Sequence, residues 1–134
     1  EKCYENVNHR KLQRAAEQHH FPLSVARMCI EMYRASRTVA WNGVFGQMVN
    51  SNQTLAAGCS IARWLLQLLM LAPLDEFVFN LPRQVRLPEV YVDDASLMVV
   101  GRIGQVSAIL AAAARQLVQA FEDGCSLPVS KSKG

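Results

Sequence analysis

The spacing of apolar residues along the chain predicts four helices. Inward-facing residues recur at steps of three and four, which is the pattern of one buried helix face. The first helix is expected within residues 7–18, capped by Asn6 or Asn8, and the second restarts after Pro22. A third, residues 60–71, is apolar on nearly all sides, so we expect it to be buried. A fourth ends at Gly124, because glycine often follows a helix. The expected inward positions are Leu12, Ala15, Ala16, Leu23, Ala26, Ile30, Tyr33, Val106, Ile109, Leu110, Ala113, Leu117 and Phe121.

Short apolar runs around tight turns predict two hairpins. Asn42-Gly43 is a strong signal for a two-residue turn, and it lies between residues 39–41 and 44–45. Two further runs, residues 87–90 and 95–100, are apolar or β-branched and enclose residues 91–94. A last short strand is expected at residues 127–130. Helices combined with such strands predict a single α+β domain, in which a small antiparallel sheet carries helices on one face.

Composition restricts the class of protein. The chain has 134 residues, of which 51% are hydrophobic and 19% are charged, so we expect one globular domain over residues 1–134. Its longest apolar run, residues 64–72, is much shorter than the roughly 20 residues of a membrane span, so no membrane contact is expected. The cysteines are scattered without a C-x-x-C pair, which is typical of reduced thiols in an intracellular protein that is not secreted. A net charge of +3 is compatible with nucleic-acid binding but too small to indicate it.

The adjacent carboxylates of Asp93 and Asp94, expected at a hairpin tip, are the most informative chemical feature. Asp tolerates the backbone angles of a tight turn, so an ordinary exposed turn is one interpretation. Adjacent carboxylates repel, however, and a turn satisfied by one Asp gains little from a second. A site for a hard divalent cation such as Mg²⁺ is the other interpretation. The residues alone leave both open.

The segment Tyr91-Val92-Asp93-Asp94 between two apolar strands resembles motif C of reverse transcriptases. Three other segments resemble motifs of that family in the same order. Residues 1–9 resemble the second half of motif A, Ala57-Gly58-Cys59-Ser60 resembles motif B, and residues 127–133 resemble motif D. Two departures stand out: the metal-binding Asp of motif A would fall two residues before the first residue, and Ala57 replaces the customary Gln of motif B.

This resemblance implies part of a reverse-transcriptase palm, with some of the fingers, from a non-LTR or group II intron-like mobile element. The family transfers nucleotides from a dNTP to the 3′-hydroxyl of a DNA primer on an RNA template, with two Mg²⁺ ions, or Mn²⁺, about 4 Å apart. The remaining fingers and the thumb would be further partners. The motif A departure implies that these residues alone are inactive.

The resemblance also assigns roles to single residues. Asp93 would bridge the two metal ions and Asp94 would support it, while Tyr91 and Gly58 would contact substrate. Tyr4 would be the gate that excludes a ribose 2′-hydroxyl, and Lys133 would act as general acid toward pyrophosphate. Without the family, Tyr4 is an ordinary half-buried aromatic, Gly58 a turn residue and Lys133 part of a solvated tail. His9, Arg10, Lys11 and Arg14 would form a basic helix face.

Two alternatives are weighed against the polymerase. A non-catalytic module that resembles a reverse transcriptase and binds RNA or protein, or a decayed element copy, would not need both aspartates. A viral RNA-dependent RNA polymerase usually has Gly where Tyr91 stands. The intact Asp93-Asp94 pair therefore favours the reverse transcriptase.

Overall fold

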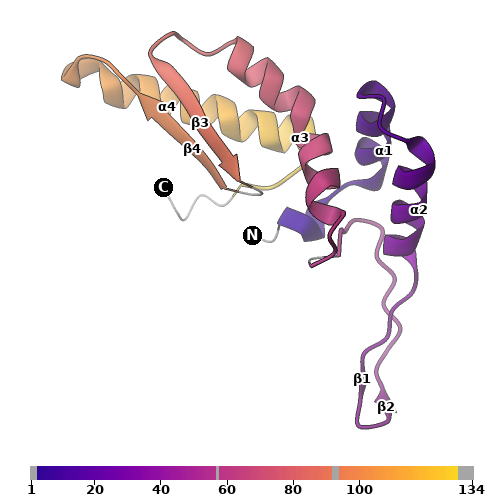
Figure 1. Ribbon diagram of the computed structural model, residues 1–134. Coiled ribbons are helices and arrows are strands. Elements are labelled where there is room, and N and C mark those ends of the chain that lie inside the picture. Colours follow the sequence, from indigo (N-terminus) through magenta and orange to yellow (C-terminus); the bar gives the residue numbers. More distant parts are fainter. Residues whose placement is uncertain (1–2, 57, 92–93, 130–134) are drawn as a thin grey trace.

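The computed structural model describes residues 3–56, 58–91 and 94–129, and within them the chain is α+β, as the sequence predicts. Helix α3 lies between the α1–α2 pair on one side and the β3–β4 hairpin with α4 on the other, while the β1–β2 hairpin projects away from the body (Figure 1). The elements are η1 (Cys3–Asn6), α1 (His9–Gln18), α2 (Leu23–Arg34), β1 (Ala40–Trp41), β2 (Val44–Phe45), α3 (Ala62–Phe79), β3 (Val85–Tyr91), β4 (Asp94–Val99), α4 (Ile103–Gln119) and η2 (Ala120–Cys125).

The start of α1 is fixed by Asn8, one of the two caps that the sequence allows. The Asn8 side-chain oxygen accepts hydrogen bonds from the backbone N–H groups of Arg10 and Lys11, at 2.9 and 3.2 Å. These donors have no partner within the helix, so the cap stabilises its first turn. Val7 and Leu12 flank the cap at the positions where an apolar pair commonly anchors a helix entry, and both are fully buried. Ala26, Ile30 and Tyr33 of α2 are buried too, as predicted.

Helix α3 is longer and more exposed than the sequence predicts. It continues past residue 71 to Phe79, and its buried residues form one face: Ala62, Leu65, Leu66, Leu69, Met70 and Phe77. The expectation that residues 60–71 are buried on nearly all sides is wrong, because Trp64 and Leu71 are 58% and 44% exposed. The helix also passes through Pro73, which lacks the N–H that would bind the Leu69 carbonyl.

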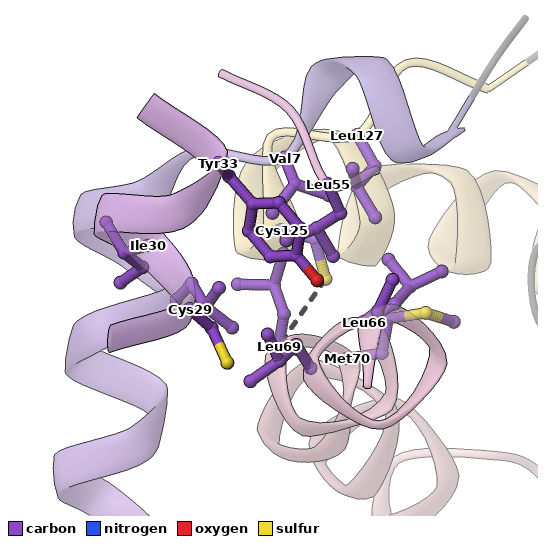
Figure 2. Close-up of a cluster of buried hydrophobic side chains, with 13 residues drawn as sticks. Val7, Cys29, Ile30, Tyr33, Leu55, Leu66, Leu69, Met70, Cys125 and Leu127 are labelled. Carbon is purple, nitrogen blue, oxygen red and sulfur yellow. Dashed lines mark hydrogen bonds between the residues drawn. The ribbon is translucent and has the colours of Figure 1, made fainter. Parts of the chain in front are cut away.

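The π-helical turn η2 compensates for this lost hydrogen bond. The thiol of Cys125 donates to the Leu69 carbonyl over 3.7 Å, inside the core drawn in Figure 2. Next to it, a Cβ added at Gly124 would lie 2.8 Å from both Cβ and Cγ of Pro73. Gly124 therefore permits a close approach of η2 to α3, and the prediction that it ends the helix is wrong. The helical turn continues to Cys125, and Ser126 then adopts the left-handed conformation (φ 56°).

Both predicted hairpins form. In β1–β2, Asn42 and Gly43 have φ angles of 48° and 79°, the positive values that a two-residue turn of this kind needs. In β3–β4, residues 85–91 pair antiparallel with 94–99. The expected strand at the end of the chain is wrong for residues 127–129, which form none. The N–H of Leu127 instead donates to the Phe121 carbonyl at 2.9 Å and closes the end of η2.

The buried core collects side chains from both ends of the chain around α3. Figure 2 shows Val7, Tyr33 and Leu55 facing Leu69, Cys125 and Leu127. Because this cluster includes segments far apart in sequence, its formation ties the N-terminal helices to the C-terminal turn. The fourth predicted helix meets this cluster through Phe121. Ala113 and Leu117 of α4 are buried but do not belong to the cluster, and Leu110 is 38% exposed.

Candidate functional site

The tip of the β3–β4 hairpin holds the candidate carboxylates. Tyr91 pairs with Asp94, so the strands are joined through Val92 and Asp93, which lie outside the described residues. Asp94 opens β4 and is exposed. The location that the sequence predicts for Asp94 is therefore confirmed, while the placement of Asp93 stays a prediction.

The two faces of this hairpin differ in exposure. Along β4, Asp94, Ser96 and Met98 are exposed and alternate with half-buried residues. Helix α4 packs on the hairpin from behind (Figure 1). The register places Glu89 opposite Ser96, so Glu89 lies on the same exposed face of the hairpin as Asp94. Both carboxylates therefore lie on the exposed face of the hairpin.

Tyr4 is anchored through its backbone to the segment that leads to Gly58. The Tyr4 carbonyl accepts hydrogen bonds from the Leu55 N–H at 2.7 Å and from the Thr54 hydroxyl at 3.3 Å. The Tyr4 side chain is half-buried against the core cluster, and Val90, next to the hairpin tip, packs against the same cluster. Tyr4 is therefore in direct contact with residues 54–55, which precede Gly58. The Tyr4 side chain and Val90 of the β3–β4 hairpin pack against the same core cluster.

His9 is a site residue that the sequence reasoning misplaced. The prediction of a basic face including His9 is wrong, because its ring is 2% exposed and His9 Nε2 lies 2.8 Å from the Thr54 carbonyl oxygen. With Nε2 as the donor, Nδ1 is a buried acceptor that has no hydrogen-bond partner among the described residues. A signal was present: His9, Leu12 and Ala16 share one face of a helix by their spacing. His9 therefore holds the Thr54 segment that in turn holds Tyr4.

Gly58 lies in a turn before α3, with a φ of 87° that strongly favours glycine. It is exposed, and a Cβ there would meet nothing within 4 Å. Two observations apply to Gly58: its left-handed φ angle explains the glycine by itself, and the open space in front of it leaves the turn accessible. Both interpretations given by the sequence fit this geometry.

The thiol of Cys59 lies beside Gly58 in a polarised environment. The Tyr33 hydroxyl donates to Cys59 Sγ over 3.2 Å and lowers the pKa of the thiol, and the backbone of Ile61 and Ala62 lowers that pKa further. Burial has the opposite effect on Cys29, whose pKa is raised by desolvation and by the nearby Cys59. The Cys59 thiol is therefore more acidic than the Cys29 thiol.

The residues present fit a divalent cation only in a limited sense. Within residues 3–56, 58–91 and 94–129, no three His, Cys, Asp or Glu side chains gather as a metal site. Mg²⁺, however, is commonly held by one or two carboxylates together with waters and substrate phosphates. Asp94, with Asp93 beside it in sequence, suits a site of that kind rather than a preformed cage. Lys133 lies outside the described residues, as do the other residues after Val129.

No protein-family model matches the chain, and no curated protein matches it either. None of the helices in the part of the chain that the structure describes has the length and apolar character to cross a membrane.

Proposed function

We propose that the chain is the palm part of an RNA-directed DNA polymerase, carrying the carboxylates for templated nucleotide transfer. The observation that supports this most is the exposed Asp94 at the tip of an antiparallel hairpin that is backed by α4. Such a tip presents oxygen ligands to solvent on a supported strand, which suits a site that binds metal together with a triphosphate.

In this proposal each residue has a separate task. Asp93 and Asp94 would hold divalent ions, and such ions would supply positive charge to the attacking and leaving oxygens. Tyr4 limits the space beside the sugar, and its carbonyl is kept in place by Thr54 and Leu55. The turn at Gly58 lets a nucleotide approach the backbone closely, because no side chain projects there.

A manganese titration of the chain tests the metal site directly. Mn²⁺ binds oxygen ligands somewhat more readily than Mg²⁺ and broadens the NMR signals of nearby amides, so it is the better probe. We expect the amides of residues 91–95 to broaden first. Asp93→Asn together with Asp94→Asn should remove this effect, because neutral amides lack the charge that attracts the ion.

A matched control is available in η2, where Glu122 and Asp123 form another adjacent, exposed acidic pair. Replacing them by Gln and Asn changes the net charge by the same amount and should leave the broadening at the hairpin intact. Broadening centred on Glu122 and Asp123 would mean that the Asp93-Asp94 tip is only a turn.

A second candidate is a nucleic-acid-binding module without catalysis. Such a module needs no metal site, and the part of the chain that the structure describes has no cluster of three His, Cys, Asp or Glu side chains. A longer polypeptide that includes the upstream motif A segment, fingers and thumb separates the two. If it is a polymerase, it extends a DNA primer on poly(rA) with Mg²⁺, and Asp93→Asn abolishes extension.

The same longer polypeptide tests sugar selection. Tyr4→Ala should admit rNTPs and leave dNTP use largely intact, since a shorter side chain removes the clash with the 2′-hydroxyl without affecting the carboxylates. Unchanged discrimination would return Tyr4 to a packing role.

A further inference from the structure

The β1–β2 hairpin forms an exposed apolar arm that none of the roles above uses. The arm comprises residues 37–49, closed at its base by the pairing of Arg37 with Val49. Its large apolar side chains are between 62% and 77% exposed: Val39, Trp41, Val44, Phe45, Met48 and Val49. It projects from the body of the molecule (Figure 1). So much contiguous apolar surface typically marks an interaction site.

The register of the arm gives each of its faces one aromatic ring. Trp41 pairs with Val44, and Ala40 pairs with Phe45. Because adjacent residues of a strand point to opposite faces, Trp41 and Phe45 lie on different faces of the ribbon. The arm is held in shape by polar contacts near its base: the Thr38 hydroxyl donates to the Gly46 carbonyl at 2.7 Å, and the hydroxyl of Ser36 donates to Asn50 Oδ1 at 2.6 Å.

The arm itself contains no acidic residue. No Asp or Glu occurs from residue 32 to residue 74, and the charged residues in that stretch are Arg34, Arg37 and Arg63. Arg34 is compensated by Glu31, whose carboxylate lies 3.2 Å from its guanidinium. Arg37 at the base of the arm is exposed and uses one N–H for the Tyr33 carbonyl, at 3.2 Å. A guanidinium has further donors, so Arg37 can also bind a phosphate.

We propose that the arm binds single-stranded nucleic acid, with bases stacked on Trp41 and Phe45 and a phosphate at Arg37. Exposed aromatic rings together with a nearby positive charge are the combination that holds unpaired strands. The arm offers Trp41, Phe45 and the exposed Arg37, and it contains no acidic residue of its own. Bases within a duplex are already stacked on each other, so duplex RNA gains little from the rings. The arm acts as a binding site separate from the β3–β4 tip, and its role does not require that the chain be a polymerase.

The two tryptophans of the chain allow a direct test. Trp64→Phe leaves Trp41 as the single tryptophan, and Trp41→Phe leaves Trp64. With a single-stranded oligo(U), stacking should quench the emission of Trp41 in the Trp64→Phe protein. An equally long RNA duplex should quench it much less.

Removing the rings should then weaken binding. In fluorescence anisotropy with labelled oligo(U), Trp41→Ala with Phe45→Ala should lower the affinity at least about ten-fold, in line with the usual contribution of base stacking. Phe79→Ala is the matched control, because Phe79 is an aromatic residue that is 88% exposed but belongs to α3. It should bind oligo(U) like the parent chain. Circular dichroism of each variant verifies that the helices are retained.

Three outcomes would overturn the proposal. Oligo(U) affinity that is unchanged without Trp41 and Phe45 would exclude stacking on the arm. Binding of anionic lipid vesicles in preference to oligo(U) would identify a membrane surface instead. Concentration-dependent dimers that disappear in the double variant would make the arm an interface between copies. The Asp93→Asn, Asp94→Asn protein should still bind oligo(U), so failure of the metal site and failure of the arm give different results.

Discussion

Replacing Gly124 by alanine should destabilise the protein, although the same change usually stabilises a helix. In a helix interior, alanine normally raises the free energy of unfolding by roughly 0.5–1 kcal/mol relative to glycine. At Gly124, however, the new Cβ would lie 2.8 Å from Cβ and Cγ of Pro73, well inside contact distance. The proline ring is rigid and belongs to α3, so relief requires η2 and α3 to move apart. Overpacking of this kind costs about 1–3 kcal/mol, of which the helix gain offsets about 0.5–1 kcal/mol, so we expect a net loss of up to about 2 kcal/mol.

Gly104→Ala provides the matched control for this prediction. Gly104 lies in the first turn of α4, and an added Cβ there meets nothing within 4 Å. The substitution should therefore leave stability unchanged or raise it by up to about 1 kcal/mol. Urea unfolding followed by far-UV circular dichroism measures both variants. If Gly124→Ala were as stable as Gly104→Ala, the close contact with Pro73 would not constrain the fold and the reasoning would be refuted.

Two further predictions concern local hydrogen bonds. Asn8→Ala should lower the free energy of unfolding by about 1 kcal/mol because it removes the cap of α1, whereas Asn8→Asp should keep most of it; equal urea midpoints for the two variants would contradict this role. The Tyr33 hydroxyl stabilises the Cys59 thiolate, so Tyr33→Phe should raise the pKa of the Cys59 thiol. Alkylation of Cys59 by iodoacetamide at mildly alkaline pH should then be slower. Cys125 is the internal reference, because burial raises its pKa to about 11 and alkylation there should stay slow in both proteins, as peptide mass spectrometry can measure. An unchanged rate at Cys59 would mean that the tyrosine does not control this thiol.

The predictions that succeeded depend on local signals. Apolar spacing located α1, α2 and α4, and Asn42-Gly43 located the arm, because a helix face and a two-residue turn are encoded within a few residues. The extension of α3 past Pro73 could not be predicted in this way. Pro73 indicates an end to the helix, and the Cys125 thiol that donates to the Leu69 carbonyl lies 56 residues away in sequence.

For the candidate site, the sequence predicted the secondary-structure elements but not the contacts between them. The hairpin that presents Asp94 follows from two short apolar runs around residues 91–94. The contact between Tyr4 and the Thr54 segment does not follow from any local pattern, because a backbone carbonyl carries no sequence signal. His9 was assigned to the surface from its basic neighbours, when its helical spacing with Leu12 indicated the interior.

The proline in α3 also has a consequence for the order of folding. Most backbone groups of α3 can form their hydrogen bonds within the helix. The Leu69 carbonyl cannot, because Pro73 has no N–H, and its donor Cys125 lies far along the chain. Contacts between distant residues form late, because closing a long loop costs entropy before the contact stabilises it. The turn η2, which reaches α3 through Cys125, should therefore become protected from amide hydrogen exchange after α3 itself. In a ribosome-bound chain, that step begins only once residue 125 has left the exit tunnel.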